Sequence, residues 1–232
     1  MKKSLLASAM ATALVAFPAV HAAELESSEQ KISYVMGLDV GARMERLEYT
    51  LDKEAFLQGL KESAPGAERT LTQEQLQQTM QEAQQLFQQR QQAEVAKLSA
   101  ENQSAGQAFL MENSKKDGVV ATESGLQYKI ITEGSGAKPS VEDTVQVHYR
   151  GTLIDGTEFD SSYSHGEPAT FPLNGVIPGW TEGLQLLSKG SKAELYIPAE
   201  LAYGPQGMGQ VIGPNSTLVF EVELLDINPT DK

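Results

Sequence analysis

VQVHYRGTLIDGTEFDSS, residues 145–162, is the most informative stretch of this sequence. Apolar residues fall on odd positions from Val141 to Tyr149, which is the period of a half-buried β-strand. Asp155-Gly156 follows, and this dipeptide is typical of a two-residue hairpin because both residues tolerate the positive φ angles of tight turns. The stretch therefore predicts two antiparallel strands joined by a short turn.

Two further strands and a short helix are expected downstream of this hairpin. Residues 193–197 and 218–224 alternate between apolar and polar side chains, as strands with one buried face do. Trp180, Leu184 and Leu187 recur at the spacing of one helical stripe. The second half of the chain is therefore predicted to be an antiparallel sheet around one short helix.

The first part of the chain is predicted to be helical. Ser27 can cap a helix that runs to about Arg46, and Asp52 can cap a second, shorter one. Gly37 and Gly41 lie four residues apart on the first helix, a spacing that lets two backbones approach closely. Two such helices are too small to form a core alone, which favours association with a second copy of the chain. A neighbouring helix of the same chain remains the alternative.

A long helix is predicted from residue 72 to residue 114. Thr72 and Gln75 form a capping box, and no helix-breaking residue follows before Gly106. Eleven of the 20 residues from 73 to 92 are glutamine. Such a polar helix cannot be buried, so we interpret it as a solvated connection between two parts of the molecule.

The N-terminus has the pattern of a secretory signal peptide. Lys2 and Lys3 precede an apolar run over residues 5–17, and residues 20–22 offer the small side chains of a cleavage site before Ala23. The run spans about 20 Å as a helix, short of the ~30 Å bilayer core, although an uncleaved anchor is the alternative. The mature chain is therefore predicted to be periplasmic or secreted, without a membrane span.

Composition excludes several classes of function. The chain of 232 residues has 18 Lys and Arg against 31 Asp and Glu, and this net charge of −13 argues against nucleic-acid binding. The absence of cysteine excludes disulfides, thiol catalysis and zinc-finger spacing. Only His148 and His165 remain after signal cleavage, and no serine has an evident His and Asp arrangement beside it. We therefore expect non-covalent activity without a metal or other cofactor.

Five motifs occur in an order that resembles the FKBP-type peptidyl-prolyl cis/trans isomerases. They are VHYRG, DGTEFDSS, VIPGWTEGL, AYG and TLVFEVELL, and the resemblance spans about residues 118–227. The segment KISYVMGLDVG, residues 31–41, is similar to the macrophage-infectivity-potentiator subfamily of bacterial envelope isomerases.

The resemblance implies an α+β fold in four parts. An N-terminal all-helical dimerisation part with a long connecting helix precedes a half-wrapped antiparallel β-sheet around a short α-helix. The expected parts are a signal peptide (1–22), a helical dimerisation segment (23–71), a connecting helix (72–114) and the isomerase domain (115–232). The implied location is the periplasm, with association with the outer membrane or secretion as alternatives.

The resemblance also implies an active site between the helix and the sheet. Trp180 is expected to form its floor, and the residues expected to bind substrate are Tyr149, Phe159, Val176, Ile177, Trp180, Met208, Ile212 and Phe220. A twisted X-Pro amide is less polar than a planar one, so a dry aromatic pocket favours it. The Tyr203 hydroxyl and the Ile177 backbone N–H are expected to hold the substrate carbonyl, with Asp160 as an electrostatic partner of the reacting amide.

Three positions depart from the usual family pattern. His165 stands where many members have an arginine, Ala169 where single-domain relatives have a rim aromatic, and Met208 where they have a loop histidine. Contact of His165 with Asp160 would make the pocket sensitive to acid, because an unperturbed histidine titrates near pH ~6.5. A solvated histidine without a partner is the alternative.

The implied partners are proline-containing unfolded or partly folded polypeptides, a second copy of the chain through the N-terminal helices, and macrolide inhibitors. A holdase that binds proline segments with little catalysis is the rival hypothesis. A structural coiled coil is disfavoured because no sustained heptads occur.

Overall fold

The structure is a computed structural model that describes residues 25–229. The predicted signal peptide, residues 1–22, lies outside the described residues. The chain divides into two compact units, one ending at Ala64 and the other beginning at Pro65.

The first unit contains two short helices, α1 (Ser28–Arg46) and α2 (Lys53–Glu62). The expected caps are confirmed: the side chain of Ser27 accepts a hydrogen bond from the Gln30 backbone N–H, and that of Asp52 accepts one from Ala55. Neither helix buries a residue. Large apolar side chains stay exposed along both helices, namely Ile32, Tyr34, Val35, Met36, Leu38, Phe56, Leu57 and Leu60.

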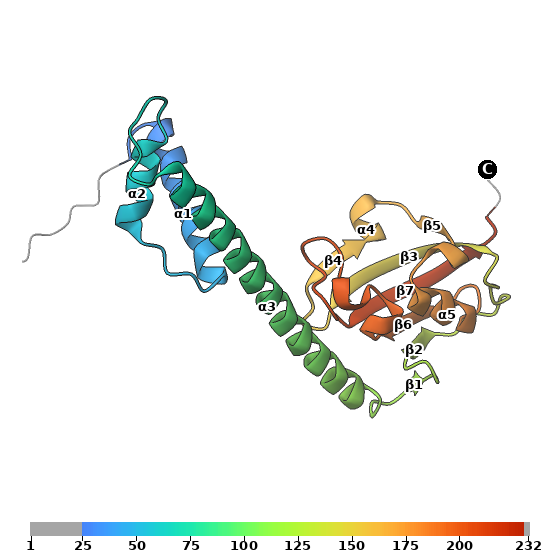
Figure 1. Ribbon diagram of the computed structural model, residues 1–232. Coiled ribbons are helices and arrows are strands. Elements are labelled where there is room, and N and C mark those ends of the chain that lie inside the picture. The colour runs from blue at the N-terminus through green and yellow to red at the C-terminus, as the bar shows by residue number, and fades with distance from the viewer. Residues whose placement is uncertain (1–24, 230–232) are drawn as a thin grey trace, which may run out of the picture. The chain divides into compact units, whose positions relative to one another are not determined.

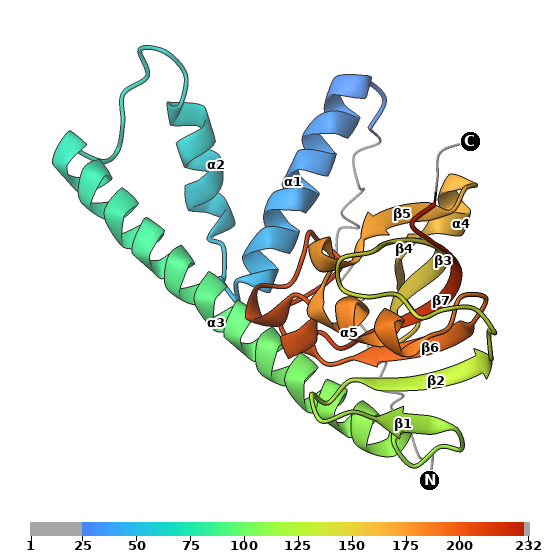
Figure 2. The ribbon, with the colours of Figure 1, turned by 90° about the vertical axis from the view of Figure 1, so that its right-hand side faces the viewer.

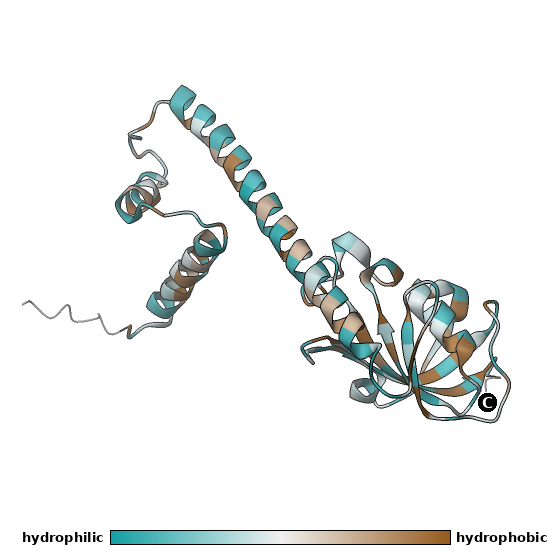
Figure 3. Cartoon of the chain, turned by 90° about the horizontal axis from the view of Figure 1, so that it is seen from below, coloured by the Kyte–Doolittle hydropathy of each residue, from teal (hydrophilic) through white to brown (hydrophobic). Residues whose placement is uncertain are grey.

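The second unit begins with α3 (Gln73–Asn113), the predicted long helix. The capping box between Thr72 and Gln75 is present, and its two hydrogen bonds measure 3.0 and 3.2 Å. Its surface is mostly hydrophilic, with a few isolated apolar residues (Figure 3). Gly106 and Asn113 alone are buried, and both lie in its last third. The first half of α3 is thus mostly exposed and has no fully buried residue, as its polar composition predicts.

The last turns of α3 pack against the sheet that follows. The Asn113 side-chain amide donates to Gln127 Oε1 at 3.0 Å, and the Gln127 amide donates to the Leu110 carbonyl at 2.8 Å. A Cβ at Gly106 would lie 2.3 Å from the Thr217 hydroxyl oxygen, so the helix approaches too closely for any side chain. The end of α3 is therefore an integral part of the second unit.

The rest of the second unit is one antiparallel sheet that curls around α5 (Pro178–Leu186) (Figures 1 and 2). The strand order is β1-β2-β6-β7-β3-β4, and β5 also pairs with β3. The strands are β1 (Val119–Ala121), β2 (Gln127–Thr132), β3 (Thr144–Leu153), β4 (Glu158–Ser161), β5 (Ala169–Pro172), β6 (Lys192–Ile197) and β7 (Leu218–Ile227), and a short helix α4 (Ser162–His165) follows β4.

The core lies between α5 and the concave face of the sheet. Alternate residues of β3 and β7 are buried, as their sequence pattern predicts. Trp180 and Leu184 of α5 face them, and Leu187 is buried just beyond the helix. A Cβ at Gly179 would lie 2.4 Å from Ile197 Cγ2, so only glycine allows the helix to pack this closely against β6.

One residue of the predicted strand pattern lies outside the strand. Val141 is 39 % exposed, and β3 starts only at Thr144. The Asp143 carboxylate accepts hydrogen bonds from the Ser140 backbone N–H and hydroxyl, at 2.7 and 2.9 Å. This local turn interrupts the alternation before the strand begins.

Candidate active site

A cavity of about 480 Å³ opens between the start of α5 and the sheet. Its walls come from β3, β4, β5, β7, the turn before α5 and the loop after β6. The lining residues are Tyr149, Phe159, Asp160, Phe171, Gly175, Val176, Ile177, Trp180, Tyr203 and Phe220.

Trp180 forms an aromatic floor with the rings around it. Its indole is 4 % exposed and meets Tyr149, Phe220 and Phe171 edge to face, at centroid distances of 5.1, 5.2 and 5.7 Å. Aromatic rings favour this geometry because the positive edge of one faces the negative face of the other. In the described part of the chain the indole Nε1 has no hydrogen-bond partner. Ring packing alone therefore fixes the floor.

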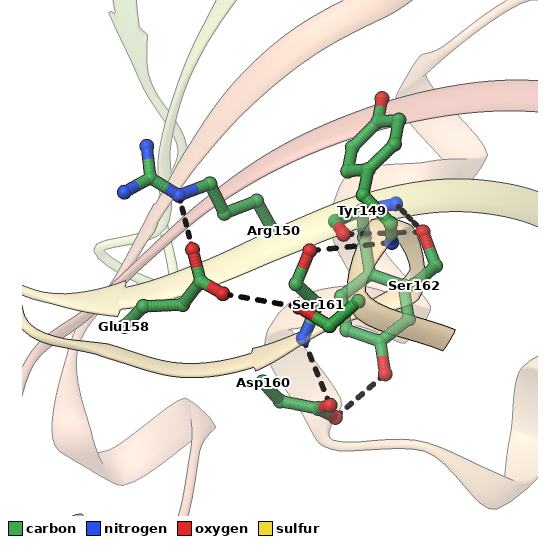
Figure 4. Close-up of polar contacts among 8 residues, drawn as sticks. Tyr149, Arg150, Glu158, Asp160, Ser161 and Ser162 are labelled. Atoms are coloured by element: carbon green, nitrogen blue, oxygen red, sulfur yellow. Dashed lines mark hydrogen bonds and ion pairs between the residues drawn. The ribbon is translucent and has the colours of Figure 1, made fainter. Parts of the chain in front are cut away.

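Asp160 lies at the edge of this cavity, where both of its carboxylate oxygens accept a hydrogen bond. The Tyr149 hydroxyl donates to Oδ2 at 2.6 Å, and the Ser161 backbone N–H donates to Oδ1 at 2.9 Å (Figure 4). Burial, together with the bond to Asp160, raises the pKa of the Tyr149 hydroxyl above its ordinary value. Tyr149 therefore stays a protonated donor and holds the carboxylate in one orientation.

Tyr203 presents the second polar group of the cavity. Burial raises the pKa of its hydroxyl, and the nearby negative charge of Asp160 adds to this effect. Within residues 25–229 no side-chain or backbone group forms a hydrogen bond with this hydroxyl. It is a neutral donor that remains available to a ligand.

Ile177 supplies a backbone donor at the first turn of α5. It is the N-cap residue, and its carbonyl accepts hydrogen bonds from the backbone N–H groups of Trp180 and Thr181 at 2.9 and 3.1 Å. Its own N–H has no acceptor among the described residues. The Pro178 ring at the first helical position fixes the backbone there.

Eight of the ten residues expected at the site line this cavity, and two do not. Met208 is 55 % exposed, and Ile212 is buried in the core. They pair with each other through two backbone hydrogen bonds of 2.8 and 3.2 Å in the loop after β6. A role for Met208 and Ile212 in substrate binding stays a prediction.

Phe171 and Gly175 line the cavity but were not identified from the sequence. Phe171 lies in β5, which has only four residues, and packs at 5.7 Å from the Trp180 ring. Phe171 alternates with exposed Thr170 and Pro172, which is a strand pattern, but four residues are too few to identify a strand from the sequence.

His165 does not contact Asp160. Its Nδ1 donates to the Ser161 carbonyl oxygen at 2.9 Å, because α4 is a single turn that brings residue 165 back over residue 161. The expected acid-sensitive pair with Asp160 is therefore wrong, and so is the alternative of a histidine without a partner. Ala169 is half-buried in β5 and pairs with Val147 of β3.

The structure also bears on metal and membrane binding. In residues 25–229 no three His, Asp or Glu side chains gather closely enough to hold a metal ion. Across the same residues, no helix combines the length and apolarity of a membrane span.

An antiparallel sheet wrapped around one helix, with an aromatic cavity edged by Asp160 and Tyr203, defines an FKBP-type domain. The family model described as "FKBP-type peptidyl-prolyl cis-trans isomerase" matches residues 135–225. A second, "Domain amino terminal to FKBP-type peptidyl-prolyl isomerase", matches residues 29–130. The chain belongs to the FKBP-type peptidyl-prolyl cis-trans isomerases, and it is an enzyme of that type.

Similar proteins match along nearly the whole chain. "Outer membrane protein MIP" of Legionella longbeachae is 44 % identical over 219 residues, covering 94 % of this chain and 93 % of its own. FkpA, an FKBP-type isomerase of Escherichia coli strain K12, is 41 % identical over 251 residues, covering 100 % and 92 %. The resemblance to the macrophage-infectivity-potentiator subfamily is therefore confirmed.

Solved structures give the same result. The crystal structure of FkpA from Escherichia coli superposes with a TM-score of 0.72 at 41 % identity, covering 90 % of this chain and 100 % of that one. A peptidyl-prolyl cis-trans isomerase from Pseudomonas syringae gives a TM-score of 0.53 at 37 % identity, covering 56 % and 96 %. The predicted α+β fold is confirmed.

Proposed function

We propose that the protein accelerates X-Pro rotation in exported polypeptides as they fold, and that the cavity over Trp180 is its active site. The assignment of isomerase activity rests on family membership. The relatives that are named isomerases favour catalysis over the rival hypothesis of a holdase. The roles of individual residues, the place in the cell and the assembly are the parts that we propose.

The aromatic cavity acts on the polarity of the reacting amide. Resonance makes the X-Pro bond planar and polar, with a rotation barrier of about 18–20 kcal/mol. At 90° of twist, nitrogen and carbonyl are no longer conjugated and the bond is less polar. When a proline ring lies on Trp180 between Tyr149 and Phe220, the reacting amide is surrounded by hydrocarbon instead of water. The loss of water disfavours the polar planar amide more than the less polar twisted one.

The polar groups orient the substrate rather than react with it. The Tyr203 hydroxyl and the Ile177 N–H both lack internal acceptors, so each can donate to a substrate carbonyl without breaking a protein bond. The Asp160 carboxylate, oriented by Tyr149, faces the same space and interacts with the amide as its dipole changes. Charge and hydrogen bonds are then in place before rotation starts.

An isomerisation assay on a short proline peptide tests these roles. Tyr203→Phe and Asp160→Asn should each lower kcat/KM about tenfold, as expected for the loss of one hydrogen bond or charge contact of ~1.4 kcal/mol. Tyr163→Phe and Asp117→Asn are matched controls on exposed side chains outside the cavity and should leave the rate unchanged. Unchanged rates in both cavity variants would refute the assigned roles.

We further propose that residues 23–71 form a homodimer with the same residues of a second copy, joined by the helix over 72–114 to the isomerase part over 115–232. Ile32, Val35 and Met36 are at least 60 % exposed on α1, and the described residues of the first unit enclose no core of their own. Exposed apolar area of this kind is what an obligate homodimer buries.

Export to the cell envelope is supported by the signal-like N-terminus and by the relatives. The Legionella longbeachae relative is named an outer membrane protein. We propose a periplasmic location for this chain, with association with the outer membrane or secretion as the alternatives. Proline-containing unfolded chains are the proposed substrates, and macrolides are proposed inhibitors, because the cavity of about 480 Å³ is lined mainly by aromatic and apolar side chains.

A further inference from the structure

The loop that carries Tyr203 is held by few bonds of its own. After Tyr203 the chain runs through Gly204, Gly207 and Gly209, all with positive φ angles, and pairs internally at one isolated bridge. The Tyr203 hydroxyl has no hydrogen-bond partner in residues 25–229, so its position is set by the backbone and by the packing of its ring against the core. Contacts that hold Gly204 therefore hold the backbone next to Tyr203 and help to position its hydroxyl.

Asn215 connects this loop to the long helix. Its backbone N–H donates to the Gly204 carbonyl at 2.8 Å, and its side-chain Nδ2 donates to the Ser99 hydroxyl of α3 at 2.7 Å. Its φ angle is +54°, in the left-handed region that asparagine adopts more readily than other residues with a side chain. One residue thus bonds α3 through its side chain and the neighbour of Tyr203 through its backbone.

A second residue of α3 holds the same segment. The Asn102 side-chain amide donates to the Pro214 carbonyl at 2.8 Å and to the Ser216 hydroxyl at 3.4 Å. One turn further along, Gly106 lies against Thr217 without room for a Cβ. From Ser99 to Gly106, α3 therefore contacts residues 214–217 at three successive points.

We infer that Ser99 and Asn102 are positioning residues for catalysis, acting through Asn215 and Gly204 on the Tyr203 hydroxyl. The inference rests on the proposed role of Tyr203. A hydrogen-bond donor must be placed to within a fraction of an ångström to act on a carbonyl in the transition state. The connecting helix is then a support of the active site as well as a spacer, although it contributes no residue to the cavity lining.

The test compares helix variants of the full chain on a short peptide. Ser99→Ala with Asn102→Ala removes both side-chain links and should lower kcat by about 3- to 10-fold with little change in KM, as misplacement of a catalytic donor does. Gln103→Ala with Ser104→Ala likewise removes one amide and one hydroxyl side chain, but at exposed positions of the same helix, and should keep the rate. Ser99→Thr retains the hydroxyl and should keep most of the activity.

Two further measurements separate positioning from a general loss of stability. In a Tyr203→Phe background the helix double variant should cause no additional loss of kcat, because the group it positions is gone. Amide exchange of the Asn215 N–H should also speed up in the double variant, since its bond to Gly204 is no longer supported.

The outcomes distinguish the two proposals. Unchanged kcat in the helix double variant, or an equal loss with and without the Tyr203 hydroxyl, would overturn the positioning role alone. Wild-type activity of Tyr203→Phe by itself would overturn the role of Tyr203 and this inference with it.

Discussion

Tyr149 donates a 2.6 Å hydrogen bond from its buried phenol to the carboxylate of Asp160, which is itself exposed. The bond joins the aromatic core to the polar edge of the cavity. Within residues 25–229, Asp160 forms no ion pair. Its charge is therefore stabilised by water on one side and by two hydrogen bonds on the other, and it is not neutralised by a cation that would cancel its field.

Replacement of Tyr149 by phenylalanine should change how many tyrosines of the folded chain ionise at alkaline pH. Burial, then the bond to Asp160, raises the pKa of Tyr149 in the native state, whereas an unfolded tyrosine ionises near pH ~10. The native state thus retains a proton that the unfolded state loses, so the stability from this group is complete below about pH 10 and is lost as pH rises through the raised pKa.

Tyrosinate absorbance of the folded and urea-unfolded chain at about pH 10–11 measures this difference. The folded chain should show fewer ionised tyrosines than the unfolded chain, and Tyr149→Phe should shrink that gap by about half a residue at pH 10 and by nearly one residue at pH 11. If the variant instead removes a tyrosine that ionises near pH ~10 in the folded chain, the hydrogen bond to Asp160 does not hold the proton.

Trp180 should report ligand entry, because it is the only tryptophan of the chain and lies under the cavity. A macrolide or proline mimic should change the emission of Trp180 in step with the heat of binding.

Trp180→Ala should lower the free energy of unfolding by about 3–5 kcal/mol, as other truncations of buried aromatic residues do. Trp180→Phe should cost less, since it keeps an aromatic ring on the floor and removes the unpaired Nε1. Calorimetric binding with unchanged emission would exclude Trp180 as the floor.

Gly106→Ala should destabilise the chain although alanine is the better helix former. The propensity gain of about 1 kcal/mol is opposed by a Cβ placed 2.3 Å from the Thr217 hydroxyl oxygen, and overpacking of this kind costs about 1–3 kcal/mol. Gly59→Ala in α2 is the matched control, because its Cβ would meet nothing within 4 Å. Thr217→Ala should restore stability to the Gly106→Ala chain; failure of that rescue would mean that the Thr217 hydroxyl is not the source of the cost.

A charge on α1 should dissociate the proposed homodimer. Met36→Lys puts an ammonium group on the apolar face of α1, and light scattering should then report a monomer that still isomerises short peptides. Met80→Lys is the control, since Met80 of α3 is 64 % exposed, as Met36 is. A wild-type chain that is monomeric at micromolar concentration would remove the basis of this prediction.

Strands and helices with a repeated pattern were predictable from the sequence. The alternation from Val145 to Tyr149 identifies β3, and the caps at Ser27, Asp52 and Thr72 identify the starts of the first three helices, α1 to α3. These signals are local, because each depends on residues within a few positions of one another.

The remaining features depend on contacts between distant residues. Phe171 belongs to a strand of four residues that exists only through its pairing with β3. Asn215 follows a Gly-Pro pair and resembles an ordinary turn residue, yet its partner Ser99 is 116 positions away. The hypothetical contact of His165 with Asp160 rested on the arginine that many family members have at this position, and one turn of helix directs His165 to the Ser161 carbonyl instead.

The solvated first half of α3 constrains chain length more strongly than residue identity. Its side chains are exposed or at most half-buried, so substitutions at the exposed positions meet little resistance as long as the helix persists. Each inserted or deleted residue, by contrast, shifts the preceding part of the helix by about 1.5 Å and turns it by about 100° about its axis. In related chains the exposed positions of this part of the helix should therefore diverge in composition, while its length changes in steps of about seven or eleven residues, which bring back the same face.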